Sequence, residues 1–270
     1  MLSALTDQQT RSYQDRGFLI LPEFLSKSEL SDWREVIDRA VTAHVAGRPV
    51  PDELTADRKY YRNVFTQCVN LWKTDPDVER LVVDQRLGKL AAQISGSTGT
   101  RLYHDHALIK EPWANPTNFH VDNPYDPYHT DRATMIWVAL DDTTIQNGCL
   151  YLLPGTHKDS HFKLGGNLSQ ASIGDLFQEY PHWADIEPVP AEMKAGDAIF
   201  ISGLVAHAAG PNMTTSRRRA FAILFMPEDA VFNGEHSALP DEVVDRLSKG
   251  DLLADDRHLP LLYSNKDEPT

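Results

Sequence analysis

Five short segments, each rich in aliphatic and aromatic residues, follow one another from residue 98 onward and are separated by Gly, Pro, Asn and Asp. Such segments favour strands, and the residues between them favour turns. No helical pattern alternates with them, so they predict an antiparallel sandwich or open barrel rather than parallel β-α-β units. The predicted strands are Leu102–Ile109, Thr134–Leu140, Cys149–Leu153, Ala198–Ser202 and Ala220–Phe225.

The first part of the chain has a different pattern, which predicts helix, strand and helix. Residues 5–16 are mostly polar helix formers, and residues 18–21 are a short apolar run. Ser26, with Glu29 three positions later, is typical of a capping box that opens a helix to about residue 45. Helical patterning returns at residues 77–94. This part should form a helical layer on the β core.

We therefore expect one domain over residues 1–270, mainly β with α. Within it, residues 1–97 should form a mainly helical N-terminal layer, residues 98–228 the β core and residues 229–270 a C-terminal extension. Barrels and sandwiches of about 200–250 residues are commonly single units. An aromatic and amide-rich patch between residues 60 and 72 should pack on the sheet, with one or two of its residues in a substrate pocket.

Composition excludes several classes of function. The chain has 26 Lys plus Arg against 39 Asp plus Glu, a net charge of -13, which argues against binding to nucleic acid or to an anionic membrane surface. Its only cysteines, Cys68 and Cys149, support neither a disulfide framework nor a Cys-based zinc site. No apolar run is long enough to span a bilayer, and the start lacks the apolar run of a secretory signal. We expect a cytoplasmic protein.

The tripeptide His-x-Asp occurs three times, at His120–Asp122, His129–Asp131 and His157–Asp159. In a chain with 11 His such matches arise by chance, so the motif cannot select a site by itself. The second and third lie in polar loops without a distant His and Arg in comparable register, and are expected on the surface. Five further histidines are expected to be structural or solvent-exposed: His104, His161, His182, His236 and His258.

The first match has the better context. In an extended segment His120 and Asp122 point to the same side, and His207 follows a strand that can place it opposite them. Two imidazoles and one carboxylate can hold one face of a ferrous ion. Arg218 shares strand parity with Ala220, whose small side chain leaves room for a carboxylate-bearing ligand. The alternatives are a polar core cluster for the first three residues and a surface charge for Arg218.

Several ordered fragments of the chain resemble the phytanoyl-CoA dioxygenase family of Fe(II)- and 2-oxoglutarate-dependent oxygenases. The resemblance covers residues 98–226 in detail, and the opening DRGFLILPEFLS is also similar. The fragments are FHVDN, MIWVALDD, NGCLYLLPGTHK, GDAIFISGLVAHAAGPN and SRRRAFAILF.

The resemblance implies a double-stranded β-helix, of the jelly-roll or cupin type, with His120, Asp122 and His207 as metal ligands and catalytic centre. It also implies that Arg218 binds the distal carboxylate of 2-oxoglutarate, that Trp137 lies beside this cosubstrate, and that Lys110 is near it. The implied cofactors are Fe²⁺, 2-oxoglutarate and O₂. The implied reaction hydroxylates an unactivated C–H bond and releases succinate and CO₂. Related halogenases lack the carboxylate ligand, so Asp122 favours hydroxylation over halogenation.

The substrate is less constrained. His106, Asn123, Tyr125 and Tyr128 are candidates for the pocket wall, although loop packing explains each equally well. No obvious basic cluster marks a coenzyme A site, so a small-molecule metabolite is expected. Desaturation or ring formation would use the same metal ligands. A non-catalytic metal-binding or sensor protein on this fold, or a sugar-isomerase or storage-type barrel, remains an alternative, and the oligomeric state is not predicted.

Overall fold

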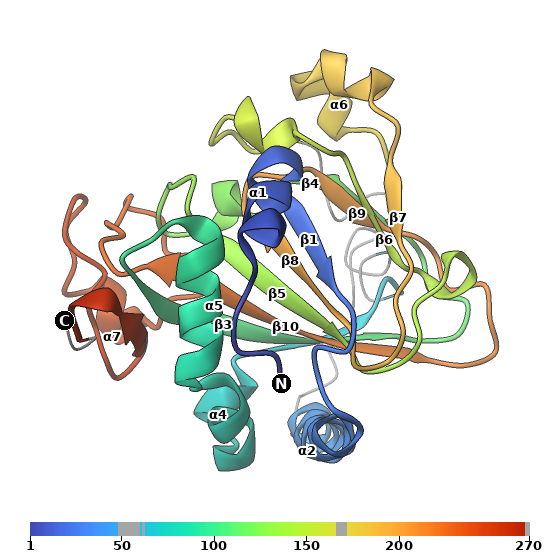
Figure 1. Ribbon diagram of the computed structural model, residues 1–270, viewed down its shortest axis with the longest axis horizontal. Helices are drawn as coiled ribbons and strands as arrows, with labels where there is room; N and C mark the ends of the chain where they lie inside the picture. Colours follow the sequence, from blue (N-terminus) through green and yellow to red (C-terminus); the bar gives the residue numbers. More distant parts are fainter. Residues whose placement is uncertain (48–59, 61–62, 166–171, 268–270) are drawn as a thin grey trace.

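Two antiparallel sheets form the centre of the computed structural model (Figure 1), which describes residues 1–47, 60, 63–165 and 172–267. The larger sheet has the order β1 (Phe18–Leu21), β8 (Ala198–Ser202), β5 (Thr134–Ala139), β10 (Arg218–Pro227), β3 (Gly99–Lys110) and β11 (Leu261–Ser264), with β2 (Thr66–Val69) also paired to β3. The smaller sheet has the order β4 (Thr117–His120), β9 (His207–Ala209), β6 (Leu150–Leu152) and β7 (Val189–Ala191).

All five predicted strands are present, with ends that differ from the predicted ones by at most a few residues. The larger sheet also takes strands from outside residues 98–228, because β1 and β2 precede this range and β11 follows it. Strands β2, β4, β7, β9 and β11 were not predicted. Each has three or four residues, and none is a continuous apolar run like the one at residues 18–21 that would mark it in the sequence.

Four helices cover one face of the larger sheet: α1 (Asp7–Arg16), α2 (Lys27–Ala46), α4 (Pro76–Val82) and α5 (Gln85–Ser95). The predicted capping box is present, since Ser26 Oγ accepts from the Glu29 amide and the Glu29 carboxylate accepts from the Ser26 amide. The single helix predicted over residues 77–94 is divided instead. Asp84 accepts from the Arg86 amide and starts a new helix there.

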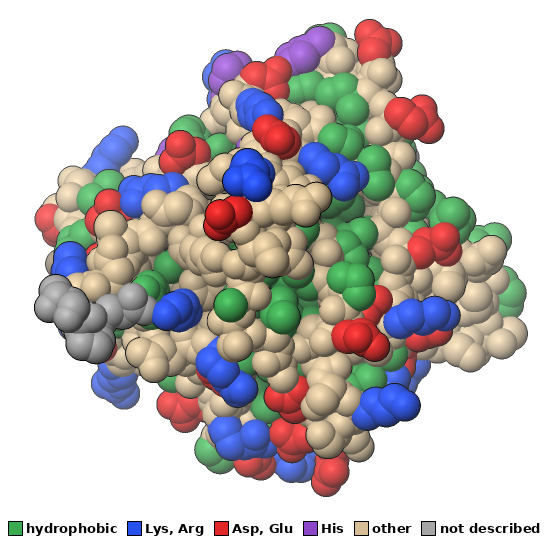
Figure 2. Space-filling view, in the orientation of Figure 1, with side chains coloured by type: hydrophobic (Ala, Val, Ile, Leu, Met, Phe, Trp, Pro, Cys, Tyr) green, Lys and Arg blue, Asp and Glu red, His purple; other side chains and the backbone are tan. Residues whose placement is uncertain are grey.

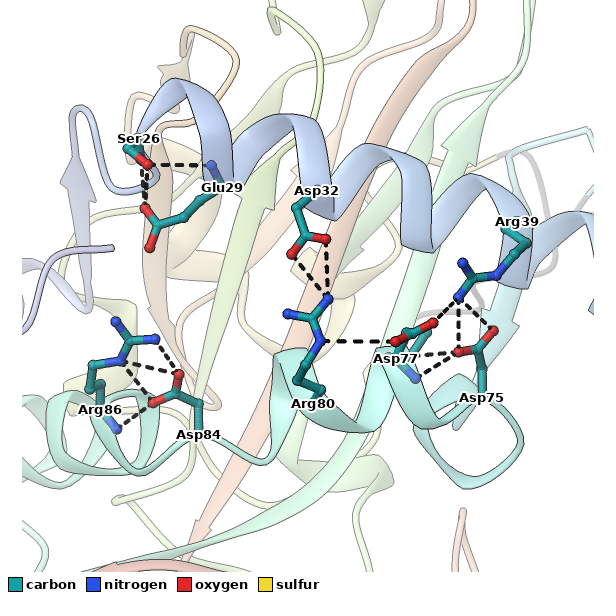
Figure 3. A network of polar contacts seen from close by, with 10 residues as sticks. Ser26, Glu29, Asp32, Arg39, Asp75, Asp77, Arg80, Asp84 and Arg86 are labelled. Carbon is teal, nitrogen blue, oxygen red and sulfur yellow. Dashed lines mark hydrogen bonds and ion pairs between the residues drawn. The ribbon is translucent and has the colours of Figure 1, made fainter.

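Surface ion pairs fasten α2 to α4 (Figure 3). The Arg80 guanidinium lies 3.1 Å from the Asp32 carboxylate, and Arg39 lies 2.7 Å from Asp77. These four side chains are about half exposed, so each pair contributes at most about 1 kcal/mol. The helical layer is therefore held mainly by its apolar contacts with the sheet.

Alternation along β10 determines which face each residue serves. Phe221, Ile223 and Phe225 pack against the helical layer, and the Trp33 ring of α2 lies edge-on to Phe221 with the ring centres 6.0 Å apart. The small residue Ala222 belongs to the second core, between the two sheets. On this face β10 therefore contributes small side chains next to Arg218, as the parity argument predicts, and larger ones farther along the strand.

The remaining helical elements are short and lie in the connections. They are η1 (Leu71–Lys73), η2 (Asn123–Tyr125), η3 (Ile145–Asn147), η4 (Thr156–Lys158), α6 (Leu176–Glu179), η5 (Pro181–Asp185), α7 (Asp241–Val244) and η6 (Asn265–Asp267).

Acidic and basic side chains are interspersed over the face in Figure 2, rather than gathered into a field of one sign. Within the described ranges, no helix combines the length and apolar character that crossing a bilayer requires.

Candidate functional site

The first His-x-Asp motif and His207 come together between the sheets. His120 at the end of β4 and His207 at the start of β9 are direct partners across the smaller sheet, with ring centres 4.2 Å apart. Asp122 lies 3.4 Å from His120 Nε2 and 3.7 Å from His207 Nε2. Among the described residues these three make up the one group of metal-ligating side chains, with one ligand atom of each within 4.8 Å of the others.

The local backbone differs from the extended segment predicted for this motif. Strand β4 ends at His120, and Asp122 has the right-handed helical conformation that opens η2. The carboxylate is therefore brought to the two imidazoles by a turn and not by strand parity. The predicted convergence is correct, but its predicted cause is wrong.

Hydrogen bonds to backbone carbonyls select the tautomer of both imidazoles. His120 Nδ1 lies 2.9 Å from the Asn118 carbonyl oxygen, and His207 Nδ1 lies 3.1 Å from the Val205 carbonyl oxygen. A carbonyl only accepts, so each Nδ1 carries a proton and each neutral ring presents the Nε2 lone pair toward Asp122. Metal-binding histidines have this arrangement.

The charges of the cluster are suited to a cation. Burial lowers the pKa of His207 to about 4 against the opposing effect of Asp122, so this ring is neutral near pH 7. The pKa of His120 is raised, because contacts with Asp122 outweigh burial. Burial would raise the pKa of Asp122, but the two imidazoles outweigh it and the pKa is lowered, leaving a carboxylate. A divalent ion would be bound by Nε2 of the two imidazoles and by the Asp122 carboxylate.

The cluster lines a cavity of about 400 Å³ between the sheets. The cavity follows one face of β10 from Arg218 to Leu224, six residues or roughly 20 Å along the strand. Its lining is mainly apolar with a few polar groups, as in small-molecule sites. The residues around the metal-ligating cluster are Phe65, Gln67, Val69, His104, His106, Leu108, Thr117, Tyr125, Asp126, Met135, Trp137, Leu150, Ala208, Ala209, Arg218, Leu224, Ser237 and Ala238.

Arg218 is a buried cation at one end of this cavity. It is 2% exposed, and its Nη atoms donate to the carbonyls of Leu108 at 3.4 Å and Gly148 at 3.2 Å. Its Nε has no hydrogen-bond partner, and among the described residues no carboxylate lies within ion-pair distance. Burial lowers its pKa to about 10, so it stays charged at neutral pH. A buried, unpaired guanidinium is a site for an anion.

Trp137 and Lys110 both lie near Arg218. The Trp137 ring lines the cavity, and the Arg218 guanidinium carbon stands 5.1 Å from its centre. Lys110 is opposite Arg218 on β3 but does not line the cavity. Its ammonium donates to the carbonyls of Val64 at 3.2 Å and Asn115 at 2.5 Å, and burial, then Arg218, lowers its pKa to about 7. Its role toward the cosubstrate stays a prediction.

The predicted substrate residues divide into two groups. His106 and Tyr125 line the cavity, and burial lowers the pKa of His106 to about 4. Asn123 is fully buried and does not line the cavity; its amide donates to Asp126 and to the Tyr128 carbonyl and accepts from the Thr130 amide. Tyr128 is likewise buried outside the lining, edge-on to Tyr103. Both of these side chains are engaged in packing the loop.

Sequence reasoning missed several lining residues. His104 was expected to be structural or exposed, yet it lines the cavity and its ring stacks on His106 with the centres 4.3 Å apart. Its parity with His106 on β3 was the available signal. Phe65 confirms that one residue of the predicted aromatic and amide-rich patch reaches the cavity. Gln67 was not part of that prediction, and nothing in the sequence signals Ser237.

The other two His-x-Asp motifs do not join a metal-ligating group within the described part of the chain. His129 stacks on Phe162 with ring centres 4.8 Å apart, and His157 Nε2 donates to the Gln14 carbonyl at 3.0 Å. Asp159 is half exposed and pairs with His182. His129, Asp131 and Asp159 are exposed, as expected from their loops, whereas His157 is half-buried.

Known proteins are similar to this chain in sequence and architecture. The sequence pattern of the phytanoyl-CoA dioxygenase (PhyH) family matches residues 13–220. The methylphosphonate hydroxylase of Gimesia maris is 27% identical over 240 residues, which are 87% of this chain and 85% of that protein.

Solved structures with the same fold confirm the predicted double-stranded β-helix. The non-heme alpha ketoglutarate dependent carbocyclase SnoK from nogalamycin biosynthesis matches with a TM-score of 0.76 at 24% identity, over 95% of this chain and 96% of that one. The epimerase SnoN, in complex with Fe³⁺, alpha ketoglutarate and nogalamycin RO, matches with a TM-score of 0.75 at 23% identity, over 95% and 98%. With the family match over residues 13–220 and the His-x-Asp and His cluster in place, this chain belongs to the phytanoyl-CoA dioxygenase (PhyH) family of Fe(II)- and 2-oxoglutarate-dependent dioxygenases.

Proposed function

We propose that this protein hydroxylates an unactivated C–H bond of a small-molecule metabolite. The observation that carries the proposal is the presence, in one cavity, of a three-residue metal cluster and a buried cation that has no carboxylate partner among the described residues. The metal cluster is suited to a divalent iron ion, and the buried cation is suited to an anionic cosubstrate that also reaches the iron.

Each residue has a role in this proposal. His120, Asp122 and His207 would hold Fe(II) on one face and leave the opposite positions open. Arg218 would bind the distal carboxylate of 2-oxoglutarate, with Trp137 beside it excluding water. When bound with dioxygen, the iron and 2-oxoglutarate supply the oxidation that converts C–H to C–OH and releases succinate and CO₂.

The other wall of the cavity would hold the substrate. His106, already expected there, and His104 beside it face the cavity as neutral rings, because burial lowers the pKa of both. Neutral rings can donate or accept hydrogen bonds without adding charge. Tyr125 contributes an aromatic surface at the rim, where it is 38% exposed. The hydroxylase named among the relatives supports hydroxylation as the outcome.

Succinate formation tests the proposal. Anaerobically purified, Fe(II)-loaded protein is supplied with 2-oxoglutarate in air, alone and with a panel of metabolites that includes methylphosphonate. We expect succinate that requires Fe(II), increases with one compound and disappears in His120→Ala. A product with one added oxygen atom identifies hydroxylation, whereas loss of two hydrogens identifies a desaturase or cyclase. Binding of Fe(II) without binding of 2-oxoglutarate or formation of succinate would favour the non-catalytic metal-binding alternative.

A further inference from the structure

The C-terminal segment that follows β10 supplies part of the cavity wall. Ser237 and Ala238 line the cavity, although they lie beyond residues 13–220, which match the family pattern. Leu224, on β10, and its strand partner Met135 line it as well. Leu224 is six residues along β10 from Arg218, so the two residues lie at opposite ends of the cavity. In Figure 1 the orange to red C-terminal segment gathers at one end of the larger sheet.

Ser237 is the centre of a hydrogen-bond network. Its hydroxyl donates to the Tyr125 carbonyl at 2.6 Å, so the Tyr103 hydroxyl, 2.9 Å away, donates to Ser237 in turn. The Ala238 amide donates to the same Tyr103 oxygen at 3.3 Å. Ser237 also has a φ of 47°, a left-handed conformation that a non-glycine residue adopts only where its surroundings hold it.

A second residue of the segment holds the same loop. Asn233 Nδ2 donates to the Asp126 carbonyl, and the Asn233 amide donates to the Pro127 carbonyl, both at 2.9 Å. The loop held in this way begins directly after the metal-cluster residue Asp122, whose carbonyl accepts from the Tyr125 amide at 2.9 Å. We call residues 233–238 the clasp.

We propose that the clasp is a specificity element, in which Ser237 positions Tyr125 and so determines which substrates the cavity accepts. This rests on the proposed function, because it treats the cavity as the substrate site. Tyr125 and Ser237 are both exposed and both line the cavity, so they form its rim. A cavity of about 400 Å³ must hold cosubstrate and substrate together, so a substrate too large for the remaining space would extend past this rim.

The variants Tyr103→Phe and Ser237→Ala each remove one hydroxyl of the network. Ser248→Ala is the matched control, since Ser248 is an exposed serine of the same C-terminal extension that does not line the cavity. Hydrogen–deuterium exchange is measured on the anaerobic complex with Fe(II) and 2-oxoglutarate. The amides of Asn123, Tyr125 and Asp126 are hydrogen-bonded and report on the loop.

We expect exchange of these amides to increase about tenfold in both network variants, as for loss of one hydrogen bond, and to be unchanged in the control. With a compound that increases succinate formation, KM for that compound should rise while kcat and KM for 2-oxoglutarate change less than about twofold. The smallest and the largest panel compounds that increase succinate formation serve as the probes, and their relative KM should shift.

Unchanged exchange in both network variants overturns the proposal. So does increased exchange without any change in the relative KM of the probes, because it indicates a structural role alone. If wild-type protein neither binds 2-oxoglutarate nor forms succinate, the proposed function fails. Exchange measured on the protein without cosubstrate then still decides whether the clasp positions the loop.

Discussion

Arg218 and Arg219 are neighbours on β10 with opposite environments. Arg218 faces the cavity, buried and without a carboxylate partner among the described residues, whereas Arg219 faces the helical layer and pairs with Asp141 at 2.7 Å and Asp38 at 2.5 Å. Because side chains alternate along a strand, Arg218 points into the cavity and Arg219 points toward the helical layer, where it forms ion pairs.

Arg218→Ala should weaken 2-oxoglutarate binding about a hundredfold, because two charge-assisted hydrogen bonds to a carboxylate are lost. Arg218→Lys should recover only part of the affinity, since an ammonium cannot form the paired contacts. Anaerobic titration of the Fe(II) protein with 2-oxoglutarate measures both. Arg219→Ala is the control and should lower the free energy of unfolding by about 1–2 kcal/mol while leaving the affinity unchanged. Equal losses of affinity in Arg218→Ala and Arg219→Ala would contradict this assignment.

His207→Ala should reduce Fe(II) affinity at least about a hundredfold, because loss of an outer hydrogen-bond partner alone costs roughly 10–100-fold. His129→Ala changes a histidine of a competing His-x-Asp motif and should leave Fe(II) affinity unaltered. Anaerobic calorimetric titration with Fe(II) compares the two variants. Similar Fe(II) affinities of the two variants would show that this cluster does not bind the metal.

Lys110→Met tests whether the ammonium serves the cosubstrate or the fold. Because the ammonium donates to the carbonyls of Val64 and Asn115, its removal should lower the free energy of unfolding by about 1–3 kcal/mol. We expect the affinity for 2-oxoglutarate to change by less than about threefold. A loss approaching that of Arg218→Ala would instead place Lys110 in direct contact with the cosubstrate. Urea unfolding and the same titration provide the two measurements.

Asp105 should make stability depend on pH. Its carboxylate accepts from the amides of Leu71 and Trp72, both at 3.0 Å, yet burial outweighs these bonds and raises its pKa to about 7. Since the pKa in the folded protein exceeds the ordinary carboxyl value of 3.8, folding takes up a proton between these two pH values. The contribution of the Asp105 carboxyl to the free energy of unfolding is therefore greatest below pH 3.8 and is lost as the pH rises to about 7.

In Asp105→Asn this particular decrease should be absent, because the amide does not titrate. The difference in unfolding free energy between wild type and variant, measured by urea at pH 5 and pH 8, isolates the contribution of Asp105. A difference that is the same at both pH values would show that the carboxyl titrates normally in the folded protein.

The sequence alone predicted the features that depend on neighbours along the chain. The helix start at Ser26, the apolar strand at residues 18–21 and the parity that places Arg218 with Ala220 are local patterns, and each is present. The metal-ligating cluster was also predicted, because the order and spacing of its motifs resemble a family whose site is built from them. Strand β9, with only three residues, was found only through its neighbours in space.

Contacts between distant segments were decided by the tertiary structure. A turn, rather than an extended strand, brings Asp122 to the imidazoles. The Asn123 side chain forms hydrogen bonds within its own loop. His104 lines the cavity because β3 turns this face inward. Ser237 is 115 residues beyond Asp122 in the chain. It lies at the site because it forms hydrogen bonds with the Tyr103 hydroxyl and the Tyr125 carbonyl. Periodicity and motif spacing describe one chain segment at a time, whereas a cavity wall depends on which segments pack together.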